Sequence, residues 1–99
     1  MTQRILITGG SGTLGSAVVR ELLRRKDGSE IIVFSRNESA HAIMRTTEEF
    51  FNLRISYYVG DVTRKEDVLH AIHTHHITHV IHTAALKRIE VAEQQPSAW

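Results

Sequence analysis

The sequence predicts an α/β fold built on a parallel sheet, and three observations support this prediction. Short apolar runs alternate along the chain with longer amphipathic segments of helical period. The run at residues 31–34 is apolar throughout, which is typical of a parallel strand covered on both faces. A glycine-rich turn joins the first apolar run to the first amphipathic segment. Right-handed crossovers between such strands give the order 3-2-1-4.

The predicted elements follow one another without a linker or an internal repeat. The four strands comprise residues 4–8, 31–34, 54–59 and 79–82. The three helices comprise residues 13–26, 37–51 and 64–75. Asn37 is placed to cap the second helix, because an amide side chain there accepts from the first free backbone N–H groups.

Each helix carries an apolar face that we expect to cover the sheet. In the first helix this face comprises Leu14, Val18, Val19, Leu22 and Leu23. In the second it comprises Ala40, Ile43, Met44 and Phe51. In the third it comprises Val68, Leu69 and Ile72.

Composition and charge exclude several functions. A chain of 99 residues forms one domain at most. Its formal net charge of +1 gives no reason to expect nucleic acid or an acidic membrane as a partner. Cysteine is absent, which excludes disulfides, thiolate zinc sites and a catalytic thiol. The first strand begins by residue 4 and no apolar run is long enough to span a membrane, so we expect a cytoplasmic protein.

The glycine-rich turn is Thr8-Gly9-Gly10-Ser11-Gly12-Thr13-Leu14-Gly15. Between a strand and a helix, this pattern is the dinucleotide-binding fingerprint of a Rossmann-like fold. Gly9 permits the tight turn, Gly12 lets the backbone approach a pyrophosphate, and Gly15 lets the helix pack close on the sheet. The candidate ligands of the cofactor from this turn are Thr8, Gly9, Gly12, Thr13, Leu14 and Gly15. Amides at a helix N-terminus favour phosphates, although a tight turn without a ligand is the alternative.

The end of the second strand favours NADP over NAD. About twenty residues after the glycines, NAD sites carry an acidic residue that binds the ribose hydroxyls. This chain has Ser35 and Arg36 there. A guanidinium pairs bidentately with a 2′-phosphate, and the serine hydroxyl can donate to it. The alternative is a solvated Arg36 and a Ser35 that only forms the turn.

The loop after the third strand supplies two further candidates. Asp61 can accept a hydrogen bond from the adenine amino group, and the backbone of Val62 can complete that contact. An equally acceptable interpretation is that Asp61 and Thr63 cap the following helix.

The loop after the fourth strand supplies Ala84, Ala85 and Lys87. Small side chains let the backbone pass close to a nicotinamide ribose at the switch point between strands one and four. Lys87 can reach a phosphate or a sugar substrate, and a surface position without a ligand is its alternative.

The seven histidines do not lead us to predict a metal site. His70, His73 and His76 have helical spacing, and His75 and His79 lie nearby. Zinc needs a further ligand and an enclosed site, which this pattern does not supply. We interpret these histidines as solvated or half-buried polar residues.

With these motifs in place, the chain resembles the extended short-chain dehydrogenase/reductase superfamily. Within it, the chain is most similar to the UDP-N-acetylglucosamine 4,6-dehydratases (inverting) and the related polysaccharide-biosynthesis epimerase/dehydratases, and the similarity covers essentially the whole chain. The glycine string marks the superfamily alone. The other strings that carry the resemblance are Phe34-Ser35-Arg36-Asn37-Glu38, Gly60-Asp61-Val62, His82-Thr83-Ala84-Ala85-Leu86-Lys87-Arg88, Ala92-Glu93 and Pro96. Among them, Ser35-Arg36 and Ala84-Ala85-Leu86-Lys87 narrow it to the subgroup.

The resemblance implies an enzyme that acts on a UDP-sugar with NADP in surface polysaccharide or glycan biosynthesis. The cofactor takes a hydride from C4, water leaves across C5–C6, and the hydride returns. The catalytic Asp-Lys pair and Tyr of such a family would follow residue 99, so no catalytic residue is assigned here and the 99-residue chain alone is expected to be inactive. Ile89-Glu90 stands where the family has a small apolar residue and proline, which puts that loop's shape in doubt.

We therefore interpret residues 1–99 as the NAD(P)-binding, N-terminal cofactor half of a larger domain, in a protein that we expect to be a homo-oligomer. Its fourth strand is expected to be an unpaired apolar edge, which proteins avoid; a mini-domain whose edge a partner covers is the alternative. A non-catalytic NADP-sensing regulator on the same fold is a rival function. An S-adenosylmethionine-dependent methyltransferase is a second rival, but it usually has an acidic residue where Arg36 stands.

Overall fold

The structure is a computed structural model, and it describes residues 3–25, 28–47, 50, 54–83 and, for the backbone alone, 87–90. Its strands are β1 (Arg4–Thr8), β2 (Glu30–Ser35), β3 (Ile55–Val59), β4 (His79–His82) and β5 (Lys87–Glu90). Its helices are α1 (Thr13–Arg25), α2 (Glu38–Thr46) and α3 (Lys65–His75). The predicted α/β architecture is confirmed, with most element boundaries within one residue of the expected ones.

The strands form one sheet of order β3-β2-β1-β4-β5, which confirms the predicted order 3-2-1-4. The first four strands are parallel, and Ile7 at the centre pairs with Val33 on one side and Ile81 on the other. Parallel strands of this order bring the carboxyl ends of β1 to β4 to the same edge of the sheet. The loops that carry the candidate residues all leave from that edge.

The expectation that the fourth strand is an unpaired edge is wrong. β5 pairs with β4 in antiparallel fashion, with Val80 opposite Ile89 and Ile81 opposite Arg88. The chain turns back directly after β4, so the nearest backbone satisfies the open hydrogen-bonding groups of that strand. The new edge carries mostly charged residue types in its sequence, which is typical of edge strands that resist further pairing.

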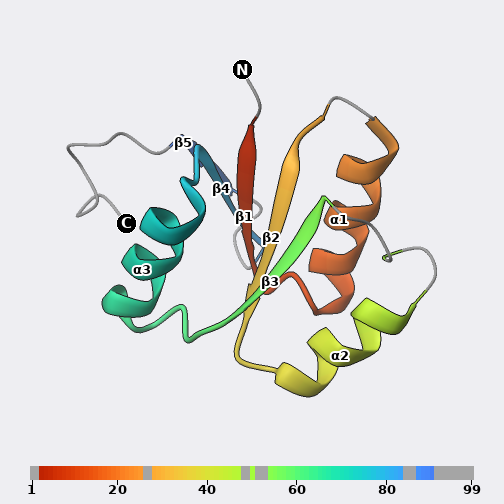
Figure 1. Cartoon of the computed structure of the whole chain (residues 1–99), viewed down its shortest axis with the longest axis horizontal. Helices are drawn as coiled ribbons and strands as arrows, with labels where there is room; N and C mark the ends of the chain where they lie inside the picture. Colours follow the sequence, from red (N-terminus) through yellow and green to blue (C-terminus); the bar gives the residue numbers. More distant parts are fainter. Residues whose placement is uncertain (1–2, 26–27, 48–49, 51–53, 84–86, 91–99) are drawn as a thin grey trace.

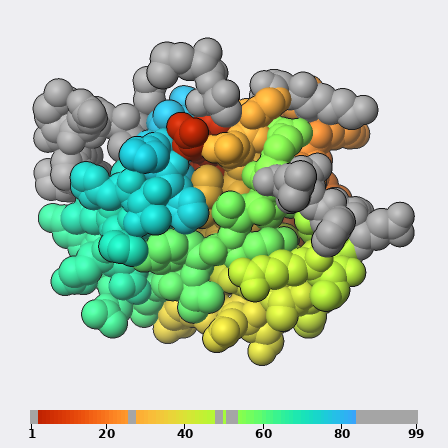
Figure 2. All heavy atoms as spheres, in the orientation of Figure 1, coloured from red at the N-terminus to blue at the C-terminus, as the bar shows by residue number. Residues whose placement is uncertain are grey.

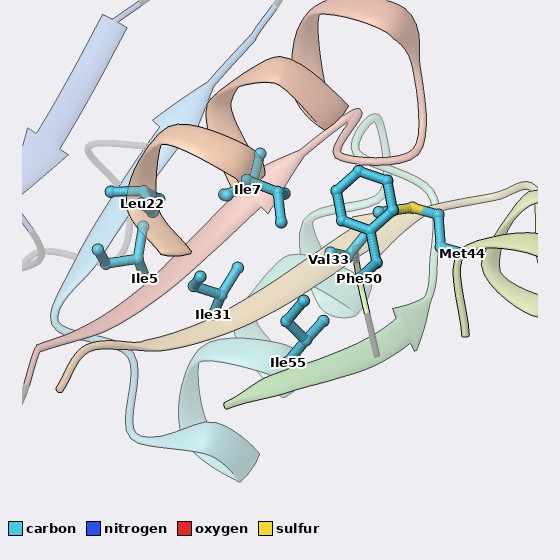
Figure 3. Packing of buried hydrophobic residues seen from close by; sticks show 9 residues of the cluster. Ile5, Ile7, Leu22, Ile31, Val33, Met44, Phe50 and Ile55 are labelled. Atoms are coloured by element: carbon cyan, nitrogen blue, oxygen red, sulfur yellow. The ribbon is translucent and has the colours of Figure 1, made fainter. Parts of the chain in front are cut away.

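Helices cover both faces of the sheet, with α1 and α2 on one side and α3 on the other (Figure 1). The core under α1 and α2 contains residues of β1, β2 and β3, among them Ile5, Ile31 and Ile55 (Figure 3). The second core, under α3, is built around Leu6, Phe34 and other apolar residues. Neighbouring residues of β1 therefore point to opposite faces, and both faces are apolar, as a parallel strand between two helical layers requires.

Two predicted core positions are exposed instead. Ile43 in α2 is 66% exposed, because this helix turns His41 and Met44 toward the sheet. Leu14 is 45% exposed in the first turn of α1. The second helix also ends at Thr46, short of the predicted residue 51, whereas its predicted cap is confirmed: the Asn37 side chain accepts from Ala40 N at 2.9 Å.

Among the described residues, none of the helices combines the length and the apolar character that a membrane crossing would require.

The space-filling view shows the side chains of β3 and the segment after it filling the front of the molecule between α3 and α2 (Figure 2).

Candidate functional site

Backbone hydrogen bonds extend beyond the strands and hold the loops at the carboxyl edge together. Gly9 N donates to Phe34 O at 2.8 Å, which fixes the loop after β1 against the end of β2. Gly60 N donates to Ser35 O at 3.0 Å, which fixes the loop after β3 there as well. On the other side, the Thr83 hydroxyl donates to Thr8 O at 2.7 Å. The loops after β1, β2 and β3 are therefore held together at one edge, with Thr83 at the end of β4 bonded to the end of β1.

The glycine-rich turn needs its glycines for different reasons. Gly9 has a φ of +71°, and a Cβ there would lie 2.6 Å from the Thr83 hydroxyl oxygen. A Cβ on Gly15 would lie 2.1 Å from Gly9 O and 2.5 Å from the Gly10 Cα. The close approach predicted for Gly15 is thus made to the loop and not to the sheet, because the start of α1 folds back over that loop.

Gly12 differs from the other two because it faces open space. A Cβ on Gly12 would come no closer than 3.4 Å to Gly9 O, which is an ordinary contact. Nothing within the described structure therefore requires a glycine at this position. The space beside it leaves room for the close approach of a phosphate, and a phosphate there stays a prediction.

The start of α1 offers backbone donors at the same place. The first helical hydrogen bond runs from Ser16 N to Gly12 O at 2.8 Å, so the amides of the preceding first turn have no acceptor within the helix. Gly12, Thr13 and Leu14 are all exposed. The Gly12 N–H already donates to Gly9 O at 3.0 Å, so an anion can reach the N–H groups of Thr13 and Leu14, and the positive end of the helix dipole favours it.

Ser35 is the junction between the glycine-rich loop and α2. Its hydroxyl lies 2.9 Å from the Ser11 hydroxyl and 2.8 Å from His41 Nε2, and it accepts from Asn37 N at 3.2 Å. Ser35 thus has the structural role expected of a turn former, and in addition links two loops of the candidate site.

His41 is the residue that sequence reasoning missed. It is 1% exposed and packs beside the Tyr57 ring at a centroid distance of 5.4 Å. Burial lowers the pKa of His41, and the Arg45 charge lowers it further, whereas Glu38 raises it. The imidazole is therefore neutral at neutral pH. The sequence offered one signal for the burial of His41: it stands one helical turn before Met44 and therefore lies on the same face of α2.

Arg36 and Asp61 form an ion pair across the ends of β2 and β3. The guanidinium Nη1 lies 3.6 Å from the Asp61 Oδ2, and the Arg36 side chain is 76% exposed. The hydroxyl and backbone N–H of Thr63 both donate to Asp61 Oδ1, and together with Arg36 they hold the pKa of this carboxyl below its usual range. Asp61 is therefore a carboxylate whose charge faces the guanidinium.

The interpretation of Asp61 and Thr63 as caps of the third helix is wrong. The cap of α3 is Arg64, whose side chain makes no capping hydrogen bond. Asp61 instead closes a local turn with Thr63, and Asp67 in the first turn of α3 reaches back to accept from Asp61 N at 2.9 Å. The carboxylate of Asp61 is therefore satisfied by Thr63, and its backbone N–H by the carboxylate of Asp67.

The remaining candidates divide into buried, partly buried and undescribed ones. Thr8 is 2% exposed and its hydroxyl lies 2.5 Å from His82 Nδ1, so its side chain points between β1 and β4. Val62 is half-buried and packs on the core under α3. Ala84 and Ala85 lie outside the described residues. Lys87, expected in a loop, is the first residue of β5, where the structure describes its backbone.

The histidines of α3 make contacts of their own. His70 Nδ1 lies 2.5 Å from the Tyr58 hydroxyl, and the rings of His75 and Tyr58 are 6.2 Å apart. Within residues 3–83, apart from the undescribed positions, no three histidine, cysteine or acidic side chains are grouped so that they could hold a metal ion.

A cavity of about 240 Å³ opens far from this surface. Its lining includes Arg4 and Glu30, the first residues of β1 and β2, and His76 after α3. It therefore lies toward the amino ends of the strands, whereas open parallel sheets bind ligands at the carboxyl ends. The candidate site is the surface at the carboxyl edge that the loops after β1, β2 and β3 form, together with Thr83 at the end of β4.

A parallel sheet of this order, with a glycine-rich turn that leads from β1 into a helix, defines the class of doubly wound dinucleotide-binding folds. Residues 5–99 match the family described as polysaccharide biosynthesis protein. The chain belongs to this family, which confirms the resemblance found from its motifs.

Relatives within and around this family are enzymes of sugar nucleotides. The chain is 36% identical over 95 residues to a UDP-glucose 4-epimerase of Rickettsia massiliae (strain Mtu5), with 93% of this chain and 27% of the relative covered. It is 37% identical over 95 residues to a UDP-N-acetylglucosamine 4,6-dehydratase (inverting) of Campylobacter jejuni, with 95% and 27% covered. The chain thus spans about a quarter of the length of these curated relatives.

A solved structure supports the same placement. The Bordetella bronchiseptica enzyme WbmG in complex with NAD matches with a TM-score of 0.61 and 31% identity, over 83% of this chain and 24% of that one. Fold and sequence therefore agree on a short-chain dehydrogenase/reductase-like architecture.

Proposed function

We propose that this chain binds NADP and forms the cofactor-binding part, residues 1–99, of a UDP-sugar epimerase or dehydratase in surface polysaccharide or glycan biosynthesis. The observation that carries the proposal is the position of Arg36. Its exposed guanidinium stands at the end of β2, beside the loop whose open glycine and free helix amides suit a phosphate. The Arg36 guanidinium and the glycine-rich loop thus offer two places for a phosphate at one edge of the sheet. This arrangement fits a dinucleotide that carries an additional 2′-phosphate.

In this proposal each loop meets one portion of the cofactor. The loop from Gly9 to Gly15 cradles the pyrophosphate, with Thr13 and Leu14 contributing backbone N–H groups. Arg36 holds the 2′-phosphate, and Ser35 stands beside it at the end of β2, in contact with Ser11 of the glycine-rich loop. Asp61 and Val62 border the adenine, and the segment of Ala84, Ala85 and Lys87 approaches the nicotinamide ribose.

NAD is the rival cofactor. The relative WbmG is described in complex with NAD. In this chain, however, the residues that end β2 are a hydroxyl and a guanidinium. The nearest carboxylate, Asp61, lies after β3 and faces Arg36. A cationic end of β2 favours a phosphate over two uncharged ribose hydroxyls.

The proposed chemistry divides between the cofactor and the protein. The nicotinamide supplies the hydride transfer, and this portion of the protein binds and orients it. No residue of the chain is assigned a catalytic role, and the chain alone is proposed to be inactive. A cytoplasmic location, a UDP-sugar substrate and a homo-oligomeric parent protein belong to the proposal as well.

Calorimetric titration of the chain with NADP⁺ and with NAD⁺ tests the proposal. We expect NADP⁺ to bind with a dissociation constant at least about tenfold lower than that of NAD⁺, which corresponds to the gain from about one charge-assisted hydrogen bond. Tighter binding of NAD⁺ would remove NADP as the cofactor. The absence of heat with either nucleotide, from a chain whose circular dichroism shows it to be folded, would overturn the proposed function altogether.

A further inference from the structure

The Ser35 hydroxyl has all three of its hydrogen-bonding positions in use. Its oxygen contacts Ser11 Oγ at 2.9 Å, His41 Nε2 at 2.8 Å and Asn37 N at 3.2 Å. A hydroxyl donates one hydrogen bond and accepts two. Asn37 can only donate, because its contact is made through a backbone N–H. Of the remaining partners, one must therefore donate to Ser35 and the other must accept from it.

The surroundings of His41 decide which one donates. His41 Nδ1 is buried and has no hydrogen-bond partner, whereas Nε2 faces Ser35. If the proton were on Nδ1, a buried N–H group would be left without an acceptor; if it is on Nε2, only a lone pair is left. Buried N–H groups without an acceptor are the rarer case in proteins. The proton is therefore assigned to Nε2, and His41 donates to Ser35.

This assignment fixes the direction of the remaining hydrogen bond. Ser35 accepts from His41 and from Asn37, so its own proton goes to Ser11 Oγ. The proton of Ser11 is then not used in this contact, and its hydroxyl makes no other hydrogen bond to the described residues. Ser11 is half-buried in the glycine-rich loop, directly before the open position of Gly12.

We infer that His41 is a positioning residue: it orders the relay His41→Ser35→Ser11 so that the Ser11 hydroxyl donates to the 2′-phosphate of the bound dinucleotide. With the opposite order, Ser11 would donate toward Ser35 and present only lone pairs to an anion, which repels phosphate oxygens. The 2′-phosphate is the phosphate concerned because the relay ends beside Ser35 at the end of β2, where Arg36 stands. This inference rests on the proposed function.

The direction of the hydrogen bonds in the relay is fixed because His41 stays neutral. The burial of His41 lowers its pKa, so the imidazole stays neutral and has one proton to place. The groups that face it are Arg45 and Glu38 from its own helix and Tyr57 from β3. Among the described residues, none of these groups forms a hydrogen bond with Nδ1.

Two substitutions at the buried end test the relay by calorimetric titration. His41→Phe keeps a ring of similar size and removes the donor, whereas His41→Gln keeps an N–H group near the position of Nε2. We expect His41→Phe to raise the dissociation constant of NADP⁺ by about tenfold, the value of one hydrogen bond to a charged group, and that of NAD⁺ by less than about twofold. His41→Gln is expected to restore most of the NADP⁺ affinity, and His73→Gln on the exposed side of α3 serves as the matched control.

The outcomes separate the inference from the function on which it rests. If the unsubstituted chain binds neither nucleotide, the proposed function fails. If it binds NADP⁺ and His41→Phe binds it equally well, or loses NAD⁺ to the same degree, the relay is overturned while the function stands.

A second variant covers the case in which His41→Phe does not fold. Ser11→Ala removes the outer end of the relay at a half-buried loop position, and we expect the same selective loss of NADP⁺. Where His41→Phe folds, its combination with Ser11→Ala should lose no more NADP⁺ affinity than Ser11→Ala alone, because both changes act on one hydrogen bond; an additive loss would overturn the relay.

The tautomer itself is observable without any ligand. Nitrogen NMR of the imidazole is expected to show His41 Nε2 protonated and Nδ1 unprotonated at neutral pH, and a proton on Nδ1 would overturn the inference.

Discussion

The guanidinium of Arg36 and the carboxylate of Asp61 face each other across the ends of β2 and β3, with Nη1 3.6 Å from Oδ2. Thr63 fixes the other oxygen of Asp61, so the carboxylate presents a defined edge to the guanidinium. An exposed pair of this kind contributes little to stability. Its importance lies in the site, because Asp61 both orients Arg36 and competes with any phosphate for it.

Replacing Arg36 by alanine is expected to affect NADP far more than NAD. Loss of a charge-assisted contact with the 2′-phosphate should raise the dissociation constant of NADP⁺ by about tenfold to a hundredfold, and that of NAD⁺ by less than about threefold. Calorimetric titration of both nucleotides measures this difference. The matched control is Arg24→Ala, since the Arg24 side chain is 77% exposed and pairs with Glu21 on α1. Equal loss of both nucleotides would remove the assigned role of Arg36.

Asp61→Asn is expected to act in the opposite direction on the same site. The amide keeps an oxygen that can accept from Thr63, but it removes the charge that competes for Arg36. We expect the affinity for NADP⁺ to rise by a factor of about two to five, in line with the small energy of exposed ion pairs. Titration in low and in high salt provides the check, because the gain should shrink as salt screens the charges. A lower affinity for NADP⁺ would show that Asp61 assists the phosphate site.

Alanine substitutions at Gly12 and Gly15 are expected to have different effects, the first on nucleotide binding and the second on stability. Gly15→Ala places a Cβ 2.1 Å from Gly9 O, a backbone atom that the loop holds in place, so we expect a loss of about 1–3 kcal/mol in the free energy of unfolding. Gly12→Ala meets its nearest atom at 3.4 Å, so it should change stability by less than about 1 kcal/mol.

The same Gly12→Ala variant is nevertheless expected to bind both nucleotides more weakly, because its methyl group occupies the approach of the pyrophosphate. Urea unfolding and nucleotide titration of the two variants measure the two effects. An unchanged affinity in Gly12→Ala would place the pyrophosphate elsewhere.

The elements that could be predicted are those that local pattern determines. Continuous apolar runs marked the strands that lie between two helical layers, and the alternation of strands and helices with right-handed crossovers predicted the order of the first four strands. The cap of α2 followed from Asn37 alone. β5 could not be found this way, because Lys87 to Glu90 reads as a polar loop and pairs only because the chain turns back beside β4.

The parts of the site that escaped prediction depend on contacts between distant segments. Residue type favoured Ile43 over His41 as a buried position, yet the hydroxyl of Ser35 gives the imidazole a partner in the interior. Arg36 and Asp61 were each singled out, but their pairing requires the order and register that set β3 beside β2. Sequence periodicity predicts which face of a helix or strand a residue occupies. It does not predict which residue of another element contacts it.

Burial of His41 should make the stability of the chain depend on pH. Its pKa is lowered in the folded state, so below the unfolded-state pKa, about 6.5, the unfolded chain binds more protons than the folded one. The contribution of His41 is therefore complete above this pH, declines as the pH falls toward the lowered folded pKa, and declines no further below it. His75, whose pKa burial also lowers, adds to the same slope. Urea unfolding between pH 7.5 and pH 5 should accordingly show a smaller loss of stability in His41→Gln than in the unsubstituted chain. An unaltered slope in His41→Gln would mean that the imidazole takes up its proton as easily in the folded chain as in the unfolded one, which is incompatible with a neutral ring that donates to Ser35 from the interior.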